Sequence, residues 1–549
     1  MRRRHYILAA LLAVVTIGQA TDYRKLSGYV RQIAQDEEMK TAASRATSPH
    51  PERLLTAFIK VKASQTDSIC SSFHLKRHAQ LGDVAIVSIP LGTLDALSEC
   101  KEVLRIEASR TSHLTMDTTA IIVGADKLQP LPSSFSHLPS TLTGRGVILG
   151  IMDIGFDLTH PNFLNATDSS PRIGAFWDHL SRDTVGSTLP VGRDFTGYEL
   201  VRAQQHSVDG LIETHGTHTL GIAAGSGHHS PYIGIAPEAD ICVVSNTVES
   251  DTVLIDSTDI YKYTTAVDAM GFKYIFDYAD RQGKPCVASF SEGYTITEMS
   301  EEDSLYSAFL DSLIGPGRII VAAAGNSGGS GPGVHAPGCF PSVICVGSTA
   351  HRLGFTNYLG LYVEYAKGRT IGMRSPYSCY GPAFNGLMKP DVLAPGDNII
   401  SSYSSFYLEA NPDAKDINSD VEHFDFEGRT YAWNANTGTS MACPVVAGVI
   451  ALWLQAKPDL TREEIIDIFS HTCRQPDATL TYPNDLYGHG EIDAYRGLLY
   501  LMGEDGIKRT DRQHPMERQR SVVYNLNGQQ LNAPRKGINI VGGRKVVVR

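Results

Sequence analysis

The feature that most constrains the fold of this 549-residue chain is a series of short apolar runs separated by longer helical stretches. Runs of this length are typical of buried strands and are too short for helices. The runs cover residues 147–152, 241–245, 287–290, 319–324 and 343–346. Strands that alternate with helices predict an α/β fold, in which a parallel sheet carries helices on both faces.

Four polar residues border these runs at glycine-rich turns. Asp153 lies in Gly-Ile-Met-Asp-Ile-Gly-Phe-Asp, His215 in Thr-His-Gly-Thr-His and Ser440 in Gly-Thr-Ser-Met-Ala-Cys-Pro. Asp, His and Ser in this chain order are one known arrangement of an acyl-transfer triad. The histidine of a triad takes the serine proton, and the aspartate orients the imidazole. Asn326, in Ala-Ala-Ala-Gly-Asn-Ser, adds an amide that could donate to an oxyanion.

The expected positions of these residues fit catalysis. Sites in parallel sheets lie at the carboxyl ends of strands. Ser440 precedes an apolar stretch over 441–454 that predicts a helix, whose N-terminus favours negative charge. Taken singly, each residue has an ordinary structural explanation, such as a turn aspartate or an N-cap serine. Their joint occurrence in this order favours the catalytic interpretation.

These segments resemble the motifs of the subtilisin-like serine peptidases, and the resemblance covers about residues 115–500. It implies a subtilisin-like α/β domain that hydrolyses polypeptides through an acyl-enzyme on Ser440. His215 would act as general base and acid, Asp153 would orient it, and Asn326 would line the oxyanion hole. The resemblance implies no cofactor for catalysis. Connecting segments match as well, at 234–237, 340–347, 380–382 and 389–396.

The segment Ala-Ser-Phe-Ser-Glu-Gly, residues 288–293, resembles the family segment beside which a substrate lies as an added strand. The resemblance implies that Ser291 and Gly293 contact the substrate backbone. Glu292 stands where an apolar residue is usual. We therefore expect this edge to favour basic or polar substrate groups.

Several positions depart from the family pattern. Thr219 and Leu220 replace the usual Val-Ala, which we interpret as a change in helix packing and not in chemistry. Cys443 replaces a commoner serine and is interpreted as a small buried apolar residue. Asn162 stands where members with a tight calcium site often carry aspartate, and the loop 225–232 lacks their asparagine-rich pattern. Because hard cations need several oxygen ligands, we assign no metal ligand, and structural calcium stays open.

The N-terminal part predicts export and a separate unit. Residues 1–20 have the charged start, apolar stretch and small-residue cleavage site of a signal peptide. Residues 21–115 predict a small α+β unit, with strands over 54–61, 83–89 and 103–108 and a helix over 91–97. This ferredoxin-like unit resembles the pro-regions of the family, which assist folding and cover the active site until they are cut. The cut is expected between Ala108 and Val123. The alternative is a retained N-terminal domain.

The C-terminal part follows the peptidase-like domain, which we expect over 116–503. A charged linker over 504–520 and a short β tail over 521–549 are predicted next. The tail resembles C-terminal sorting tails of the type IX secretion route, whereas the alternative is a β extension that packs on the core. Signal peptide and tail together predict a protein that is secreted or held at the cell surface.

Net charge, the length of apolar stretches and cysteine spacing exclude some classes of protein. A net charge of −11 argues against a nucleic-acid partner. No stretch after the signal peptide has the length of a membrane span. Nine cysteines are scattered singly, without the spacing of a zinc site or a dense disulfide framework, although Cys70 and Cys100 could pair.

The sequence leaves open the role of two insertions and the class of function. Polar insertions over 351–374 and 404–429 either shape substrate access or elaborate the surface. A catalytically silent binding protein could keep the fold, and an esterase or narrow processing enzyme could use the same site. The intact set of Asp153, His215, Ser440 and Asn326 favours an active endopeptidase.

Overall fold

The computed structural model describes residues 22–26, 30, 54–108, 118–129, 138–296, 300–364, 369–384 and 386–503, and 523–525, 530–531, 537–541 and 544–548 of the C-terminal segment. The chain divides into two compact units, Met1–Thr115 and Met116–Arg549. The expected signal peptide and linker lie outside the described residues.

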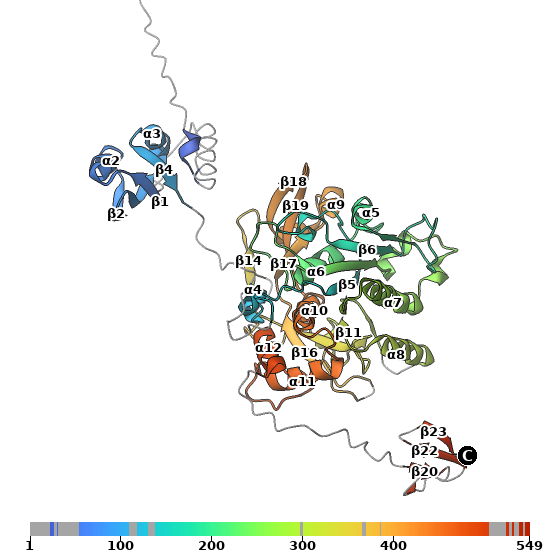
Figure 1. The fold of residues 1–549 in the computed structure, drawn as a ribbon. Coiled ribbons are helices and arrows are strands. Elements are labelled where there is room, and N and C mark those ends of the chain that lie inside the picture. Colours follow the sequence, from blue (N-terminus) through green and yellow to red (C-terminus); the bar gives the residue numbers. More distant parts are fainter. Residues whose placement is uncertain are drawn as a thin grey trace, which may run out of the picture. The chain divides into compact units, whose positions relative to one another are not determined.

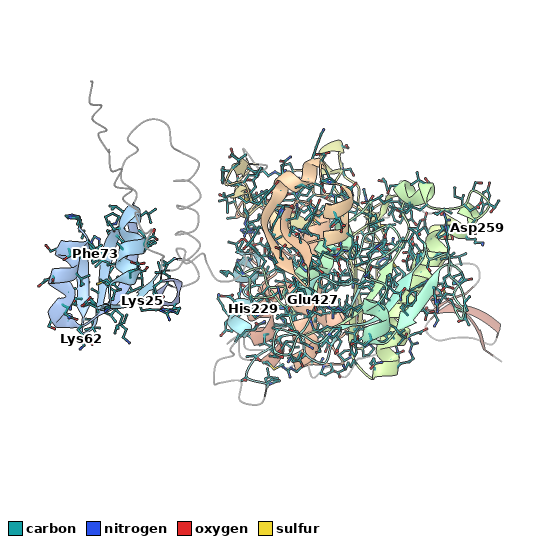
Figure 2. The ribbon with its side chains drawn as sticks, turned by 90° about the horizontal axis from the view of Figure 1, so that it is seen from above. Lys25, Lys62, Phe73, His229, Asp259 and Glu427 are labelled. Carbon is teal, nitrogen blue, oxygen red and sulfur yellow. The ribbon has the colours of Figure 1, made fainter. Side chains whose placement is uncertain are left out.

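In its described residues, the N-terminal unit contains a four-stranded antiparallel sheet and the two helices that Figure 1 labels α2 and α3. Its elements are β1 (Leu54–Val61), α2 (Thr66–Ser72), β2 (Lys76–Leu81), β3 (Val84–Pro90), α3 (Leu94–Glu99) and β4 (Val103–Glu107). Alternate residues of β1 are buried, as expected for a strand with one face on a core. Strand β2 is absent from the sequence prediction because all its residues are exposed and show no apolar alternation. Figure 2 shows Lys62, which follows β1, and Phe73, which follows α2.

The second unit is built on an eight-stranded sheet with the order β16-β13-β11-β9-β5-β8-β6-β7. Neighbouring strands are parallel except for the antiparallel pair β6–β7. The predicted parallel sheet is confirmed, and each apolar run of the sequence supplies one of its strands. The strands are β5 (Ile148–Asp153), β6 (Ile173–Asp178), β7 (Arg193–Thr196), β8 (Asp240–Ser245), β9 (Cys286–Phe290), β11 (Arg318–Ala323), β13 (Ile344–Thr349) and β16 (Val392–Pro395).

Helices cover both faces of this sheet (Figure 1). Leu149 and Ile151 of β5 belong to a core shared with α6, α10, α11 and α12, whereas Ile148 and Met152 belong to a core shared with α7 and α8. Because both faces are buried, these strands are apolar at nearly every position. The helices are α6 (His215–Ala224), α7 (Thr265–Gln282), α8 (Glu301–Leu313), α10 (Thr439–Ala456), α11 (Arg462–Thr472) and α12 (Ala494–Met502).

Shorter elements complete the unit. A three-stranded sheet has the order β17-β19-β18, and β10–β12 and β14–β15 form two-stranded antiparallel sheets. The C-terminal segment forms a separate four-stranded antiparallel sheet, ordered β21-β20-β22-β23. The bounds are α4 (Thr118–Ile122), α5 (Tyr198–Arg202), β10 (Tyr294–Thr295), β12 (His335–Ala336), β14 (Gly354–Thr356), β15 (Tyr362–Glu364), β17 (Ile399–Tyr403), α9 (Ser405–Ala410), β18 (Asp420–Phe426), β19 (Arg429–Asn436), β20 (Val523–Asn525), β21 (Gln530–Leu531), β22 (Gly537–Val541) and β23 (Arg544–Val548).

Helix α10 is the most deeply buried helix of the second unit and contains the stretch predicted as helical over 441–454. Its residues 439–454 are all buried. In the described part of the chain it is the one helix long and apolar enough to cross a bilayer, so the expectation that no later stretch has that length is wrong, but 89% of the stretch lies inside the protein. Burial of this kind is typical of the core helix of a globular domain.

Candidate active site

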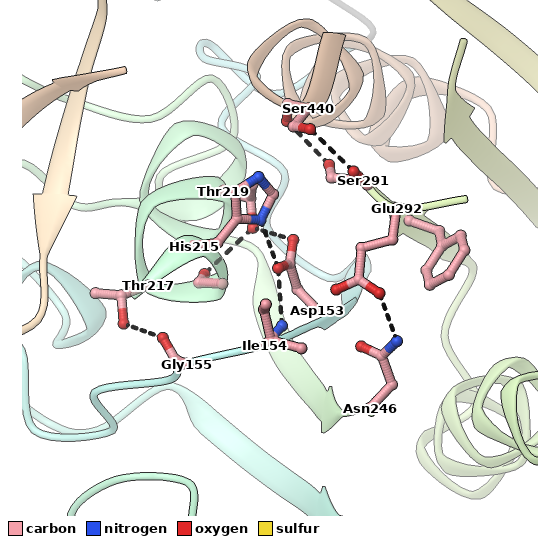
Figure 3. A network of polar contacts seen from close by, with 12 residues as sticks. Asp153, Ile154, Gly155, His215, Thr217, Thr219, Asn246, Ser291, Glu292 and Ser440 are labelled. Atoms are coloured by element: carbon pink, nitrogen blue, oxygen red, sulfur yellow. Dashed lines mark hydrogen bonds and ion pairs between the residues drawn. The ribbon is translucent and has the colours of Figure 1, made fainter. Parts of the chain in front are cut away.

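Asp153 and His215 meet at the carboxyl edge of the sheet (Figure 3). Asp153 is the last residue of β5 and is fully buried, and His215 is the first residue of α6. Oδ1 of Asp153 lies 2.6 Å from Nδ1 of His215 and also accepts the N–H of Ile154 at 2.8 Å. The contact uses Nδ1, so Nε2 stays available on the other side of the ring.

The charge of Asp153 tunes the imidazole. Burial lowers the pKa of His215, but the negative charge of Asp153 and its hydrogen bond, with a smaller effect from Glu213, raise the pKa above its ordinary value. The protonated imidazole is therefore stabilised in this site. A general base needs this property at the moment it takes up a proton.

Thr219 completes the surroundings of Asp153. Its buried hydroxyl donates to Oδ2 of Asp153 at 2.9 Å. The sequence interpretation of Thr219 as a packing change did not include this hydrogen bond to Asp153. The signal was present, because residues four apart lie on one helix face, and His215 and Thr219 have that spacing.

Ser440 lies in the first turn of α10 and is 7% exposed. Its hydroxyl donates to the carbonyl of Ser291 at 2.9 Å, and the Ser291 hydroxyl donates to the carbonyl of Ser440 at 2.9 Å. In this structure the Ser440 hydroxyl is thus bonded to Ser291 rather than to His215. Helices α6 and α10 pack against each other, which brings His215 and Ser440 into one site (Figure 3).

Asn326 follows strand β11 and is oriented by the residue before Ser440. The N–H and the hydroxyl of Thr439 donate to Oδ1 of Asn326 at 2.9 and 3.0 Å. Because Oδ1 is occupied, the Nδ2 group is directed away from Thr439, and the side chain is exposed. Nδ2 and the N–H of Ser440 at the helix N-terminus can therefore both donate to an anionic oxygen.

Ser291 and Gly293 lie on the segment that leaves β9. Gly293 approaches β12 so closely that a Cβ there would lie 2.4 Å from the carbonyl oxygen of Ala336. Any larger residue would displace one of the two backbones, so this position requires glycine. The main chain of the segment is thereby kept close to β12.

Glu292, the residue between Ser291 and Gly293, is half-buried. Its Oε2 accepts from Nδ2 of Asn246 at 2.7 Å, because that amide at the end of β8 offers a donor. Burial, together with the charge of Asp153, raises the pKa of Glu292 well above its usual range. The expected preference of this edge for basic or polar substrate groups stays a prediction.

Two further residues of the motif segments, His218 and Cys443, lie in the core. Nε2 of His218 lies 3.0 Å from the carbonyl oxygen of Asn434, and burial lowers the pKa of His218 to about 4. Burial raises the pKa of Cys443 to about 12, so its thiol is not a nucleophile at neutral pH. All nine cysteines are unpaired, including Cys70 and Cys100, which the sequence analysis allowed to pair.

The position considered for calcium is filled by protein hydrogen bonds. Nδ2 of Asn162 donates to the hydroxyl of Ser402 at 2.7 Å, and its Oδ1 accepts the N–H of Gly227 at 2.6 Å. A cation would have to replace the second bond and would face an N–H donor. Within the described ranges, no three His, Cys, Asp or Glu side chains form a group suited to a metal ion.

The insertion over 404–429 is anchored beside the site, which sequence reasoning could not foresee. The N–H of Ser404 donates at 3.0 Å to the hydroxyl of Thr214, the residue before His215. The N–H and hydroxyl of Ser405 donate to Oδ2 of Asp157 at 2.9 and 2.6 Å. The start of this insertion therefore supports the loop that carries the histidine.

Known proteins resemble this chain over the same region. The model of the Subtilase family matches residues 144–490. Serine protease AprX of Bacillus subtilis is 29% identical over 408 residues, which cover 72% of this chain and 75% of AprX. Thermitase of Thermoactinomyces vulgaris is 26% identical, covering 65% of this chain and 90% of thermitase. The solved CspB protease of Clostridium perfringens is 18% identical with a TM-score of 0.48, covering 69% of this chain and 98% of that one.

The parallel sheet and the matched segments define a hydrolase of the serine peptidase class. The chain belongs to the subtilase family and is a subtilisin-like serine endopeptidase.

A second buried carboxyl supports the loop after Asp153. Oδ2 of Asp209 accepts the N–H of Gly155 at 2.8 Å, and its Oδ1 accepts the hydroxyl of Ser245 at 3.2 Å. Burial, with the charge of Asp178, raises the pKa of Asp209 to about 8. The side chain is therefore mostly protonated at neutral pH.

We expect Asp209→Asn to flatten the dependence of stability on pH. The ordinary aspartate pKa in an unfolded chain is about 3.9, so between about pH 4 and 8 the unfolded chain loses a proton that the folded chain keeps. Stability should fall across that window in the parent and fall less in Asp209→Asn. Thermal unfolding at pH 5 and pH 8, in a Ser440→Ala background that prevents self-digestion, measures this difference. The exposed Asp413→Asn is the control, and an equal fall in all three proteins would contradict the prediction.

Proposed function

We propose that this protein is a secreted serine endopeptidase that cleaves polypeptides through an acyl-enzyme on Ser440. The observation that carries the proposal is the 2.6 Å contact between Asp153 and His215 at the sheet edge where α10 presents Ser440. Membership of the subtilase family supports peptide bonds as the target.

The proposed reaction begins with a change of hydrogen-bond partner. When substrate binds, the Ser440 hydroxyl leaves the Ser291 carbonyl and bonds Nε2 of His215. His215 takes the proton while Oγ attacks the carbonyl carbon of the scissile bond. The carbonyl oxygen becomes negative and accepts from the N–H of Ser440 and from Nδ2 of Asn326.

In the second half of the proposed reaction, His215 gives up the proton and water hydrolyses the acyl-enzyme. Protonated His215, stabilised by Asp153, gives its proton to the leaving nitrogen, and the C–N bond breaks. A water then gives a proton to His215 and attacks the acyl-enzyme, which releases the acid and restores Ser440. The scheme needs no cofactor, and structural calcium remains without an assigned ligand. Backbone groups of Ser291 and Gly293 would hold the substrate as an added strand.

The N-terminal unit would act as a pro-region and inhibitor of the enzyme. Two features support this role: the unit has its own hydrophobic core, and Leu54, Phe58 and Leu104 expose apolar side chains on its sheet. Exposed apolar groups of this size are typical of a surface that docks on a partner. We propose export through residues 1–20, a cut between Ala108 and Val123, and sorting to the medium or cell surface through the tail at 521–549.

Replacement of the nucleophile tests this function. Ser440→Ala should abolish cleavage of a denatured protein such as casein, with a loss of at least about 10³-fold, because no acyl-enzyme can form. Intact-mass analysis should show that the parent loses its N-terminal unit and that the variant keeps it. Ser470→Ala, an exposed serine on α11, is the matched control and should behave as the parent. Absence of cleavage by the parent would instead favour the silent binding protein.

Replacement of Thr219 tests the support of Asp153. Thr219→Val keeps the shape but removes the hydroxyl bond to Oδ2. Hydrogen bonds to charged groups contribute about 1.5–3 kcal/mol, so we expect kcat to fall about 10-fold or more with little change in KM. The less stabilised carboxylate should hold the His215 proton more strongly and move the acidic limb of kcat/KM to higher pH.

The control for this prediction is Thr217→Val on the same helix. The Thr217 hydroxyl donates to the carbonyl of Gly155 at 2.8 Å and does not touch Asp153. Its loss should lower stability without moving the pH profile. The same shift of the acidic limb in both variants would contradict the assigned role of Thr219.

A further inference from the structure

A cavity of about 190 Å³ lies beside the carboxyl edge of the sheet. Strands β6 and β8 end at its wall and helix α7 begins there, and His179, Thr247 and Asp268 are among its lining residues. Thr247 follows Asn246, whose N–H donates to the main-chain carbonyl of Asp153 at 3.0 Å. The cavity wall is therefore one residue away from a direct neighbour of the catalytic aspartate.

Asp268 is the charged group of this wall. In the part of the chain that the structure describes, its carboxyl makes no hydrogen bond or ion pair, and burial alone raises its pKa to about 7. Acidic residues in the first turn of a helix commonly interact with the free N–H groups there. Asp268 lies in the first turn of α7, yet its side chain accepts none of those N–H groups. The stability of α7 therefore does not account for this carboxyl.

Two neighbours of the carboxyl are unpaired as well. Oγ1 of Thr247 and both ring nitrogens of His179 are buried without a hydrogen-bond partner among the described residues. His179 is 1% exposed, its ring lies 4.2 Å from that of Trp177, and burial lowers its pKa to about 3, so it is neutral. Each buried polar group left unpaired costs about 1–3 kcal/mol. Several such groups around one cavity indicate a polar ligand.

The wall favours a cation. Asp268, Thr247 and neutral His179 all offer acceptor atoms, and the carboxyl of Glu292 is close enough to interact electrostatically with Asp268. Lys262, which precedes α7, is paired with Asp259 at 2.9 Å and does not neutralise Asp268. A hard metal ion needs about six oxygen ligands, more than one carboxylate and one hydroxyl provide. An ammonium or guanidinium group needs fewer acceptors.

We propose that this cavity binds the basic side chain of a polypeptide substrate, with Asp268 as its charge partner. The enzyme then selects chains that carry Lys or Arg close to the scissile bond. This inference rests on the proposed function. The bond between Asn246 and Glu292 joins the end of β8 to the segment 291–293, along which the substrate backbone is placed. Successive residues of an extended peptide are about 3.3 Å apart. The side chain of a residue a few positions from the scissile bond can therefore reach the cavity.

The test uses the enzyme matured from the full-length chain and its Asp268→Asn variant, which keeps the size of the side chain. Cleavage sites in a proteome-derived peptide library give the position at which Lys or Arg is enriched. Two fluorogenic peptides then differ only there, one with Lys and one with norleucine. In the parent, kcat/KM should be about 10- to 100-fold higher for the Lys peptide, because a hydrogen bond to a charged group strengthens binding by about that factor. In Asp268→Asn the ratio should fall to near 1 while cleavage of the norleucine peptide is kept.

Asp259→Asn, which removes the partner of Lys262 outside this cavity, is the control and should keep the parent's ratio. A parent enzyme that cleaves the library without enrichment of Lys or Arg overturns the inference and leaves the proposed function intact. An unchanged ratio in Asp268→Asn also overturns it. Absence of any cleavage by the parent overturns the proposed function itself. The library result does not depend on the folding of any variant.

Discussion

The hydrogen bond between Asp153 and His215 is the interaction on which the rest of the site depends, and the sheet determines its geometry. Asp153 ends β5, which lies between β8 and β9 and is buried on both faces. This strand cannot shift without disturbing two hydrophobic cores. His215 opens the helix that packs beside α10, so one rigid arrangement of β5, α6 and α10 brings together Asp153, His215 and Ser440.

Unusual electrostatics surround this arrangement. Asp209, Glu292 and Asp268 are carboxyls whose pKa values are raised by burial, and all three lie near the ends of the central strands. Buried carboxyls without charge partners reduce stability, and natural proteins accept that loss mainly at functional sites. Asp209 and Glu292 are bonded to neighbouring backbone or amide groups, which suits a supporting role. Asp268 has no such partner, which is why it is the residue assigned to a ligand.

Local patterns and long-range contacts differ in how well they can be predicted. The buried strands and helix α10 were predictable because their apolar residues follow one another in the sequence. The four motif residues could be named because each lies in a distinctive turn. The bond from Thr219 to Asp153 joins residues 66 positions apart, and that from Ser404 to Thr214 joins residues 190 apart. No local sequence pattern predicts contacts between residues so far apart in the chain. The bond between Asn246 and Glu292 is of the same kind, since it joins residues 46 positions apart.

Covalent labelling with a fluorophosphonate tests most directly whether Asp153 and His215 activate Ser440. Such a reagent reacts with a serine whose proton is being withdrawn. The account predicts one adduct, located on Ser440 by peptide mass, and a labelling rate that falls about 10³- to 10⁴-fold in Asp153→Asn. An adduct on another residue, or equal rates in the parent and Asp153→Asn, would contradict it.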